Sequence, residues 1–256
     1  MAEWLAQAPG WLQAMPEGMQ GLLYSLYRVF LLNDNWKFFA NGLKVTALTT
    51  LGALFLGVII GVLVAVIRSA HDSRRANARP NIILNIANLL CKLYLTVIRG
   101  TPMMVQLLIA SFVIMTPRGQ TETLICAVVT FGINSGAYVA EIVRSGIMSI
   151  SAGQMEAGRS LGLNYGKTMW YIIIPQAIKN ILPALGNELI TLVKETSIVT
   201  TIGLNDLTKG AQIIVSNTYE TMVAYICLAL IYLVIVLFLT KLLGILERRL
   251  RASDRR

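Results

Sequence analysis

The chain is short of charge. Only 14% of its 256 residues are charged, whereas 55% are apolar. Soluble globular domains usually carry about 25% charged and about 45–50% apolar residues. So little charge excludes a disordered chain and argues against an ordinary soluble enzyme, because a surface facing water needs more polar groups. The composition therefore predicts a protein that sits in lipid.

Cysteine and histidine are also scarce. The three cysteines, Cys91, Cys126 and Cys227, lie far apart in apolar stretches, and the single histidine, His71, lies among arginines. These residues form neither a disulfide framework nor a metal-ligand spacing. We therefore expect buried, unpaired cysteines, no metal and no cofactor.

Catalytic motifs are missing as well. The sequence contains no Ser/His/Asp set and no pair of histidines with metal-ligand spacing. Residues 162–168 (GLNYGKT) resemble a phosphate-binding loop, but only three residues separate the two glycines and no strand is expected before them. We therefore expect that the chain is not an enzyme and that any nucleotide chemistry belongs to a partner.

Long apolar stretches are abundant. A membrane helix needs about 20 mostly apolar residues, and the candidate spans are residues 42–67, 82–116, 123–143, 180–203 and 221–246. We expect residues 82–116 to form one helix bent at Pro102, because proline removes a backbone donor and crowds the preceding turn. Gly57 and Gly61 form a small-xxx-small pair, which predicts close helix packing. The predicted fold is an all-α integral membrane protein with five transmembrane helices.

The distribution of basic residues predicts the orientation. Fourteen Lys and Arg lie in segments 68–79, 144–179 and 241–256, whereas five lie in segments 1–41, 117–122 and 194–220. Cytoplasmic loops of membrane proteins carry the excess of Lys and Arg. We therefore place the C-terminus in the cytoplasm and the N-terminus outside. This topology explains the net charge of +9 without a nucleic-acid partner.

The apolar stretch at residues 22–32 (LLYSLYRVFLL) is too short to span a membrane. It predicts an interfacial helix on the outer face. A sixth span formed with the neighbouring residues is the alternative, but it would place the C-terminal arginines outside. The chain is thus divided into an extracytoplasmic segment (1–41), a transmembrane domain (42–247) and a basic cytoplasmic tail (248–256).

The cytoplasmic segment 144–176 is too long for a simple turn. Ser151 and Gln154 have the spacing of a capping box, so a helix should begin there. Gly162 is expected to end that helix in the left-handed region. A second short helix should begin at Asn164 and end before Pro175. A pore does not need such a helix pair, whereas a soluble partner that drives the spans does.

This segment resembles the EAA loop of bacterial ABC importer permeases, at about residues 151–176. The pattern is Glu-Ala-Ala, three residues, Gly, nine residues, Ile, one residue and Leu-Pro. The matching positions, which the resemblance assigns to ATPase coupling, are Glu156, Ala157, Gly158, Gly162, Ile172, Ile174 and Pro175. Gly158 and Ile174 stand where the pattern has Ala and Leu, and both are small changes in size.

Other stretches are similar to the polar amino acid permease subfamily. They are residues 135–156, Arg99-Gly100-Thr101-Pro102, Lys194-Glu195-Thr196-Ser197 and Leu246-Glu247-Arg248-Arg249-Leu250. The resemblance covers roughly residues 35–251. It implies a type I importer permease in the bacterial cytoplasmic (inner) membrane, with five spans and cytoplasmic coupling helices. The implied partners are two ABC ATPase subunits, a second permease subunit of the same or a related kind, an extracytoplasmic amino acid-binding protein, the amino acid substrate and membrane lipid.

A secondary transporter driven by an ion gradient, or a channel subunit, is the alternative function. Secondary transporters commonly contain internal repeats, and no repeat is recognisable in this sequence. Neither alternative explains an EAA-type loop. The resemblance therefore favours the ATP-driven importer.

Ionisable residues inside a membrane are costly and commonly functional. Glu188 is the most interior by the expected boundaries, and Asn187 and Thr191 bracket it. A carboxylate there faces either a passing ammonium group or a basic residue on another helix. Glu141 is a further candidate, although pairing with Arg144 at i,i+3 is favoured for it. The candidate substrate-path residues are Asn187, Glu188, Thr191, Lys194, Glu195 and Glu141.

Overall fold

The computed structural model describes residues 4, 6, 9–72 and 81–252, which are almost entirely helical and include no strand. The α-helices are α2 (Gly10–Gln13), α3 (Glu17–Phe30), α4 (Trp36–Asp72), α5 (Ile82–Gly100), α6 (Met103–Ile109), α7 (Gln120–Met148), α8 (Ala152–Ser160), α9 (Tyr165–Thr168), α10 (Ile174–Glu195), α11 (Leu207–Thr218) and α12 (Thr221–Ala252). Two π-helices, η2 (Ala110–Met115) and η3 (Met169–Ile173), and two 3₁₀-helices, η1 (Leu32–Asp34) and η4 (Thr196–Ile202), connect them. The all-α prediction is confirmed.

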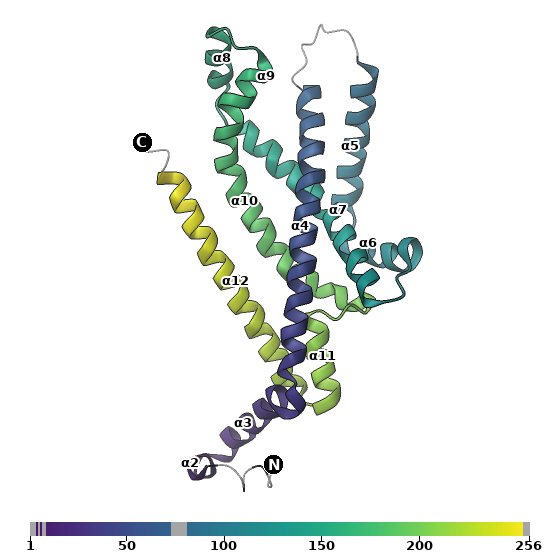
Figure 1. Cartoon of the computed structure of the whole chain (residues 1–256), viewed down its shortest axis with the longest axis vertical. Helices are drawn as coiled ribbons and strands as arrows, with labels where there is room; N and C mark the ends of the chain where they lie inside the picture. Colours follow the sequence, from purple (N-terminus) through teal and green to yellow (C-terminus); the bar gives the residue numbers. More distant parts are fainter. Residues whose placement is uncertain (1–3, 5, 7–8, 73–80, 253–256) are drawn as a thin grey trace.

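Within the described residues, four helical segments are long and apolar enough to cross a membrane. They are Leu32–Asp72, Ile82–Gly100, Gln120–Met148 and Thr221–Leu250. The fifth predicted span corresponds to α10, which begins at Ile174 rather than at residue 180 and has 22 residues. It is less apolar because it carries four charged side chains, but it packs between α7 and α12 in the bundle (Figure 1).

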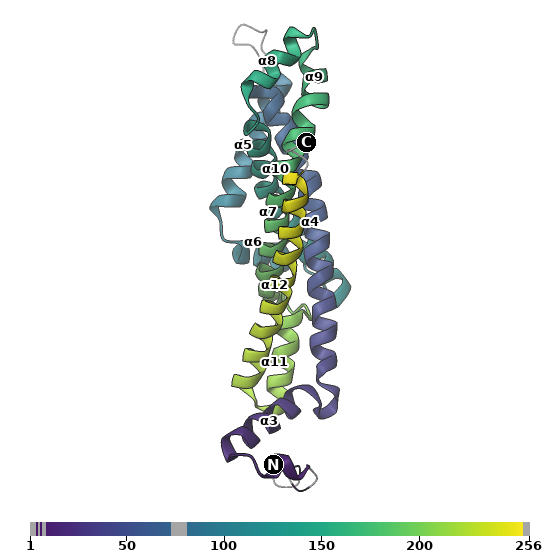
Figure 2. The same ribbon diagram turned by 90° about the vertical axis from the view of Figure 1, so that its left-hand side faces the viewer.

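The elements separate into two ends (Figures 1 and 2). The end of α4 at Asp72, the start of α5 at Ile82, the helices α8 and α9, and the Ala252 end of α12 lie toward one end. The helices α2 and α3 and the turn between α11 and α12 lie at the other. The described parts of the three basic segments therefore share one end, although the tail residues 253–256 and the arginines within 73–80 lie outside the described residues.

The centre of the bundle is the crossing of α4 and α7. A Cβ added at Gly61 of α4 would lie 2.6 Å from the Cβ of Val139, and one at Gly57 would lie 3.0 Å from Ser135. The crossing is reciprocal, because Gly132 and Gly136 of α7 are equally crowded by α4 side chains. Close packing at the Gly57–Gly61 pair, as predicted, is thus confirmed.

The expected single helix over residues 82–116 is interrupted. Thr101 and Pro102 are extended (φ −119°, ψ 146° and φ −64°, ψ 136°), so α5 ends and the chain turns aside into α6 (Figure 1). The prediction of a bend was wrong because the residue before a proline avoids the helical region. Pro102 cannot donate to the Ile98 carbonyl, and the Gln106 side chain does so instead (2.7 Å).

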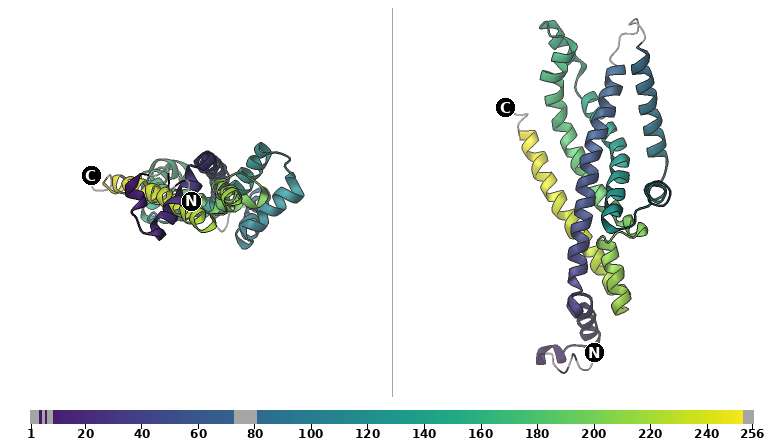
Figure 3. Two further views of the ribbon diagram at one scale, coloured as in Figure 1. Left: turned by 90° about the horizontal axis from the view of Figure 1, so that it is seen from below. Right: turned by 45° about the vertical axis from the view of Figure 1, so that its right-hand side comes forward.

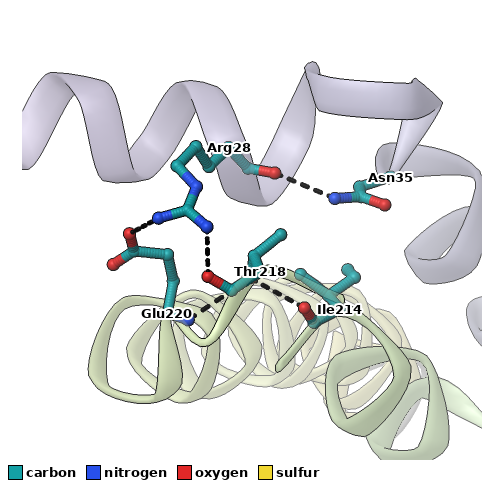
Figure 4. Close-up of polar contacts among 5 residues, drawn as sticks. All are labelled: Arg28, Asn35, Ile214, Thr218 and Glu220. Carbon is teal, nitrogen blue, oxygen red and sulfur yellow. Dashed lines mark hydrogen bonds and ion pairs between the residues drawn. The ribbon is translucent and has the colours of Figure 1, made fainter. Parts of the chain in front are cut away.

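The helix α3 is bonded to the turn between α11 and α12. Arg28 Nη1 lies 2.7 Å from Glu220 Oε1, and its Nη2 donates to the Thr218 carbonyl (Figure 4). Viewed from other sides, α3 extends from the end of the bundle, while α5 and α12 flank α4 (Figure 3).

The helix expected at residues 22–32 is present as part of α3, which begins earlier, at Glu17. Val29 on its apolar side is fully buried in a cluster with α11 and α12 residues. Met19 and Leu22 on the same side stay about half exposed, at 48% and 53%. The placement of this helix at the membrane surface remains a prediction. The three cysteines are buried and unpaired, as predicted.

Candidate functional site

The helix α8 has the two ends that its sequence predicts. Ser151 precedes it, and the Ser151 hydroxyl accepts a hydrogen bond from the amide two residues on (3.3 Å). At the other end Gly162 has φ +79° and donates its amide to the Arg159 carbonyl (3.0 Å). The Leu163 amide donates to the Gly158 carbonyl at the same distance. This pair of bonds is a Schellman motif, which satisfies the last carbonyls of the helix.

Gly158 is the contact point between α8 and the following elements. A Cβ at Gly158 would lie 2.4 Å from Cγ2 and 2.8 Å from Oγ1 of Thr168. Thr168 is fully buried, and its hydroxyl donates to the Asn164 carbonyl (3.0 Å). The departure from Ala at this position therefore has a structural cause: Thr168 fills the space that the alanine methyl group would need.

The second coupling helix begins as predicted but does not end as predicted. The Asn164 side chain accepts from the Lys167 amide (2.9 Å) and caps α9. The chain then stays helical through η3 into α10, so the expected end before Pro175 is wrong. Proline normally clashes with the carbonyl four residues earlier. Here the wider π-turn, in which the Ile174 amide donates to the Met169 carbonyl, accommodates it.

The predicted coupling residues form two groups by exposure. The exposed group is Glu156, Ala157, Gly162 and Pro175, and the buried or half-buried group is Gly158, Ile172 and Ile174. Leu161 adds a large apolar side chain that is 79% exposed. Within the buried group, Gly158 and Ile172 lie where α8 packs against α9 and η3.

A polar contact inside the bundle joins α7 to α10. The Ser135 hydroxyl donates to Glu188 Oε1 at 2.7 Å. Ser135 is fully buried and Glu188 is half-buried. Gly57 of α4 approaches the same point, since a Cβ there would lie 3.0 Å from Ser135 Oγ. The Glu188 carboxylate therefore lies where α4, α7 and α10 meet.

The other path candidates on α10 are more accessible. Thr191 is half-buried, and Asn187, Lys194 and Glu195 are exposed. Side chains three, four or seven residues apart lie along one side of a helix. Together with Glu188, these residues place polar side chains along two turns of α10.

Glu141 belongs to a different cluster. Its Oε1 accepts a hydrogen bond from Arg68 Nη1 of α4 (2.9 Å), and Arg99 of α5 lies 3.8 Å away. The expected pair with Arg144 is present at 3.9 Å, and Arg144 lies 3.8 Å from Asp72. The structure thus separates Glu141 from Glu188 and gives it a closer partner than the one predicted.

Sequence reasoning missed the partner residues on α7 and α4. Asn134 and Ser135 are adjacent polar residues in the middle of an apolar span, and both are used: Asn134 donates to Gln106 (2.9 Å) as Ser135 donates to Glu188. Buried polar side chains in a membrane helix mark such contacts. Arg68 lies just beyond the expected end of its span. No sequence pattern near Arg68 therefore predicts its hydrogen bond to Glu141.

The comparisons with known proteins agree with this geometry. Residues 82–252 match the family described as "Binding-protein-dependent transport system inner membrane component". The chain belongs to this family. The arginine transport system permease protein ArtQ of Bacillus subtilis (strain 168), a relative in sequence, is 39% identical over 85% of this chain and 94% of its own. The glutamine transport system permease protein GlnP of Escherichia coli (strain K12) is 35% identical over 82% and 92%.

Solved structures show the same fold. An amino acid ABC transporter crystallised with histidines matches with a TM-score of 0.74 and 42% identity, over 83% of this chain and 94% of that chain. The inward-facing MetNI methionine ABC transporter matches with a TM-score of 0.58 at 20% identity, over 92% and 99%, which supports the fold alone. The predicted ABC importer permease fold and the family resemblance are both confirmed.

Proposed function

We propose that this chain is the membrane-spanning permease subunit of an ATP-driven, binding-protein-dependent importer of polar amino acids. The observation that carries the proposal is the exposed pair of elements around α8 and α9, with the EAA-type residues at its surface. Family membership and the amino acids in the names of the relatives support it. The proposed partners are two ABC ATPase subunits, a second permease subunit and an extracytoplasmic binding protein.

The end that carries α8 and α9 is proposed to face the cytoplasm. The described parts of the three basic segments lie toward this end, and positive loops are retained in the cytoplasm. The C-terminal end of α12 then also lies inside, and α3 lies outside, where its half-exposed Met19 and Leu22 contact the membrane surface. The proposed location is therefore the bacterial cytoplasmic membrane, with the N-terminus outside.

Helical continuity provides the mechanical step. Because the chain stays helical from Tyr165 to Glu195, α9 and Glu188 lie on one continuous helical element, and α8 packs against α9 and η3 at its start. When the ATPase subunits close on ATP, they displace α8 and α9. This displacement reaches Glu188 through the backbone of α10 rather than through a flexible loop. The spans then change between inward-facing and outward-facing arrangements, and the binding protein delivers the substrate.

The substrate is proposed to pass along α10. Glu188 offers a carboxylate to the ammonium group that every amino acid carries, and Ser135 holds this carboxylate in place. Asn187, Thr191, Lys194 and Glu195 supply further polar groups on the same helix, and the opposite charges of Lys194 and Glu195 suit a zwitterion. Glu141, which faces arginines, is better suited to a structural or coupling role.

The proposal is tested by reconstituting the chain with its ATPase and binding protein and measuring uptake of labelled arginine, histidine, glutamine and glutamate. We expect uptake only with ATP and binding protein present. Glu156→Lys should release the ATPase or uncouple it, because it reverses an exposed charge on the docking surface. Normal assembly, ATPase stimulation and uptake in that variant would contradict docking through α8. Uptake driven by an ion gradient without ATP would favour a secondary transporter.

A further inference from the structure

Glu141 joins three helices through one carboxylate. It accepts from Arg68 of α4 and lies close to Arg99 of α5 and to Arg144 of its own helix α7. These side chains are partly buried, with exposures of 15% for Arg68, 32% for Glu141 and 44% for Arg99. The cluster is separate from the Ser135–Glu188 contact, and the proposed passage of substrate along α10 does not use it.

One side of the cluster is rigid. The helices α4 and α7 cross at Gly61 and Gly136, where even a methyl group would collide with the other helix. Arg68 and Glu141 continue this crossing by nearly two turns toward the coupling end, and their contact is a full hydrogen bond at 2.9 Å. Interdigitated helices without room for adjustment move together. We therefore treat α4 and α7 as one body.

The other side of the cluster is loose. Arg99 approaches Glu141 only to 3.8 Å and lies over the ring of Tyr138 (5.6 Å to the centroid). It is the second-last residue of α5, and only Gly100 separates it from the extended Thr101 and Pro102. The position of α5 relative to the α4–α7 body therefore depends partly on this ion pair. Charges attract more strongly in a low-dielectric surrounding than in water, so separating them there is costly.

The cluster also reaches the coupling elements. Arg144 and Asp72 line a cavity of about 410 Å³ whose wall includes Tyr165 of α9 and Met169 of η3. A displacement of α9 therefore acts close to the Arg144 end of the cluster, while the Arg99 end lies at the break between α5 and α6.

We propose that Glu141 is a positioning residue for the transport cycle, which makes α5 follow the α4–α7 body when the coupling elements move. This inference rests on the proposed function. The Glu141–Arg99 ion pair couples movement of the α4–α7 body to the end of α5. The chain leaves the helix there, at Thr101 and Pro102. A merely structural role would be confined to neutralising the partly buried Arg68, and Arg99 would then be dispensable.

The test is a double-mutant cycle on the reconstituted complex with Glu141→Gln, Arg99→Gln and both changes together. The readout is substrate transported per ATP hydrolysed, normalised to assembled complex, so that loss of folding is scored separately. We expect each single variant to lower this ratio about fivefold or more, the lower end of typical couplings between sites. The double variant should be no worse than either single one, because both remove the same pair.

Two further variants keep the outcome interpretable. Arg99→Lys retains the charge and should retain most of the coupling. Glu122→Gln removes a carboxylate at the opposite end of α7, where it accepts from the Arg118 amide, and should leave the ratio unchanged. If the complex with Glu141→Gln does not assemble, the Arg99→Gln variant alone tests the inference. Arg99 is the more exposed partner.

Wild-type coupling in assembled Arg99→Gln complexes, or additive effects in the double variant, would overturn the inference and leave the proposed function intact. Absence of ATP-dependent uptake by the wild-type complex would instead contradict the proposed function, and the role of Glu141 with it.

Discussion

The Ser135 hydroxyl donates a 2.7 Å hydrogen bond to the Glu188 carboxylate, although the two residues are 53 positions apart. The contact joins α7 to the helix that continues from the coupling elements, and Gly57 of α4 leaves the room for it. A carboxylate held in this way inside the spans is fixed in position and keeps further lone pairs free for a substrate ammonium group.

Glu188→Gln should impair transport more than Ser135→Ala. The first change removes the charge that we propose faces the substrate, and a hydrogen bond to a charged group is worth about 1.5–3 kcal/mol. We therefore expect the KM for uptake to rise about tenfold or more, with a smaller rise for Ser135→Ala. The measurement is the concentration dependence of uptake in proteoliposomes. Glu247→Gln, near the end of α12, is the control, and an unchanged KM in Glu188→Gln would remove this residue from the path.

Gly61→Ala should destabilise the protein, because the added methyl group would lie 2.6 Å from the Val139 side chain and 2.8 Å from the backbone of Ala140. Overpacking of this kind costs about 1–3 kcal/mol. Gly244→Ala in α12 is the matched control, because nothing lies within 4 Å of its Cβ. It should be neutral or raise stability by up to about 1 kcal/mol. Thermal unfolding in detergent compares the two, and equal midpoints would mean that the α4–α7 crossing adjusts freely.

Gly158→Ala should weaken ATPase binding even though it moves the sequence toward the EAA pattern. The new methyl group collides with Thr168 and displaces α8 from η3. Thr168→Ser removes the nearest atom, Cγ2, while retaining the hydroxyl bonded to Asn164. We expect the double variant Gly158→Ala/Thr168→Ser to recover part of the loss. Co-purification of the ATPase measures both, and full ATPase binding by Gly158→Ala alone would contradict the steric explanation.

The proposed orientation predicts which ends are accessible from outside the cell. Tyr219 is 86% exposed at the α3 end of the bundle, and Leu161 is 79% exposed at the α8 end. In intact cells, a membrane-impermeant maleimide should label Tyr219→Cys but label Leu161→Cys only after permeabilisation. The wild-type protein is the control, because its cysteines are buried. The reverse labelling pattern would invert the topology and contradict cytoplasmic coupling.

Removing the carboxylate of Glu220 should loosen α3 from the bundle. Glu220→Gln replaces a partly buried ion pair with a neutral contact and should lower the free energy of unfolding by about 1–2 kcal/mol. The exchange Arg28→Glu/Glu220→Arg should recover only part of this loss, since Arg28 also donates to the Thr218 carbonyl (Figure 4). Thermal unfolding with and without 1 M salt, which screens exposed pairs, tests this, and no change in either variant would show that α3 is held by apolar packing alone.

Local patterns were sufficient for much of the architecture. Apolar runs predicted three of the spans closely, and Ser151, Gly162 and Asn164 predicted three of the four ends of the coupling helices, whereas the expected end before Pro175 was wrong. These features depend on residues within a few positions of one another. The Glu-Ala-Gly segment also sufficed for the family, since its spacing to Gly162 and Pro175 lies within one stretch of chain.

The tertiary structure alone decided how those elements are connected and which charges meet. The helix ends before Pro102 because Thr101 is extended, whereas it continues through Pro175 because a π-turn makes room there. Glu141 and Glu188 have the same side chain, but one faces arginines and the other a serine. Their nearest partners, Arg68 and Ser135, lie 73 and 53 positions away in the sequence. Pairing over such separations is set by where the α4–α7 crossing places each helix face, and periodicity along a single helix does not specify it.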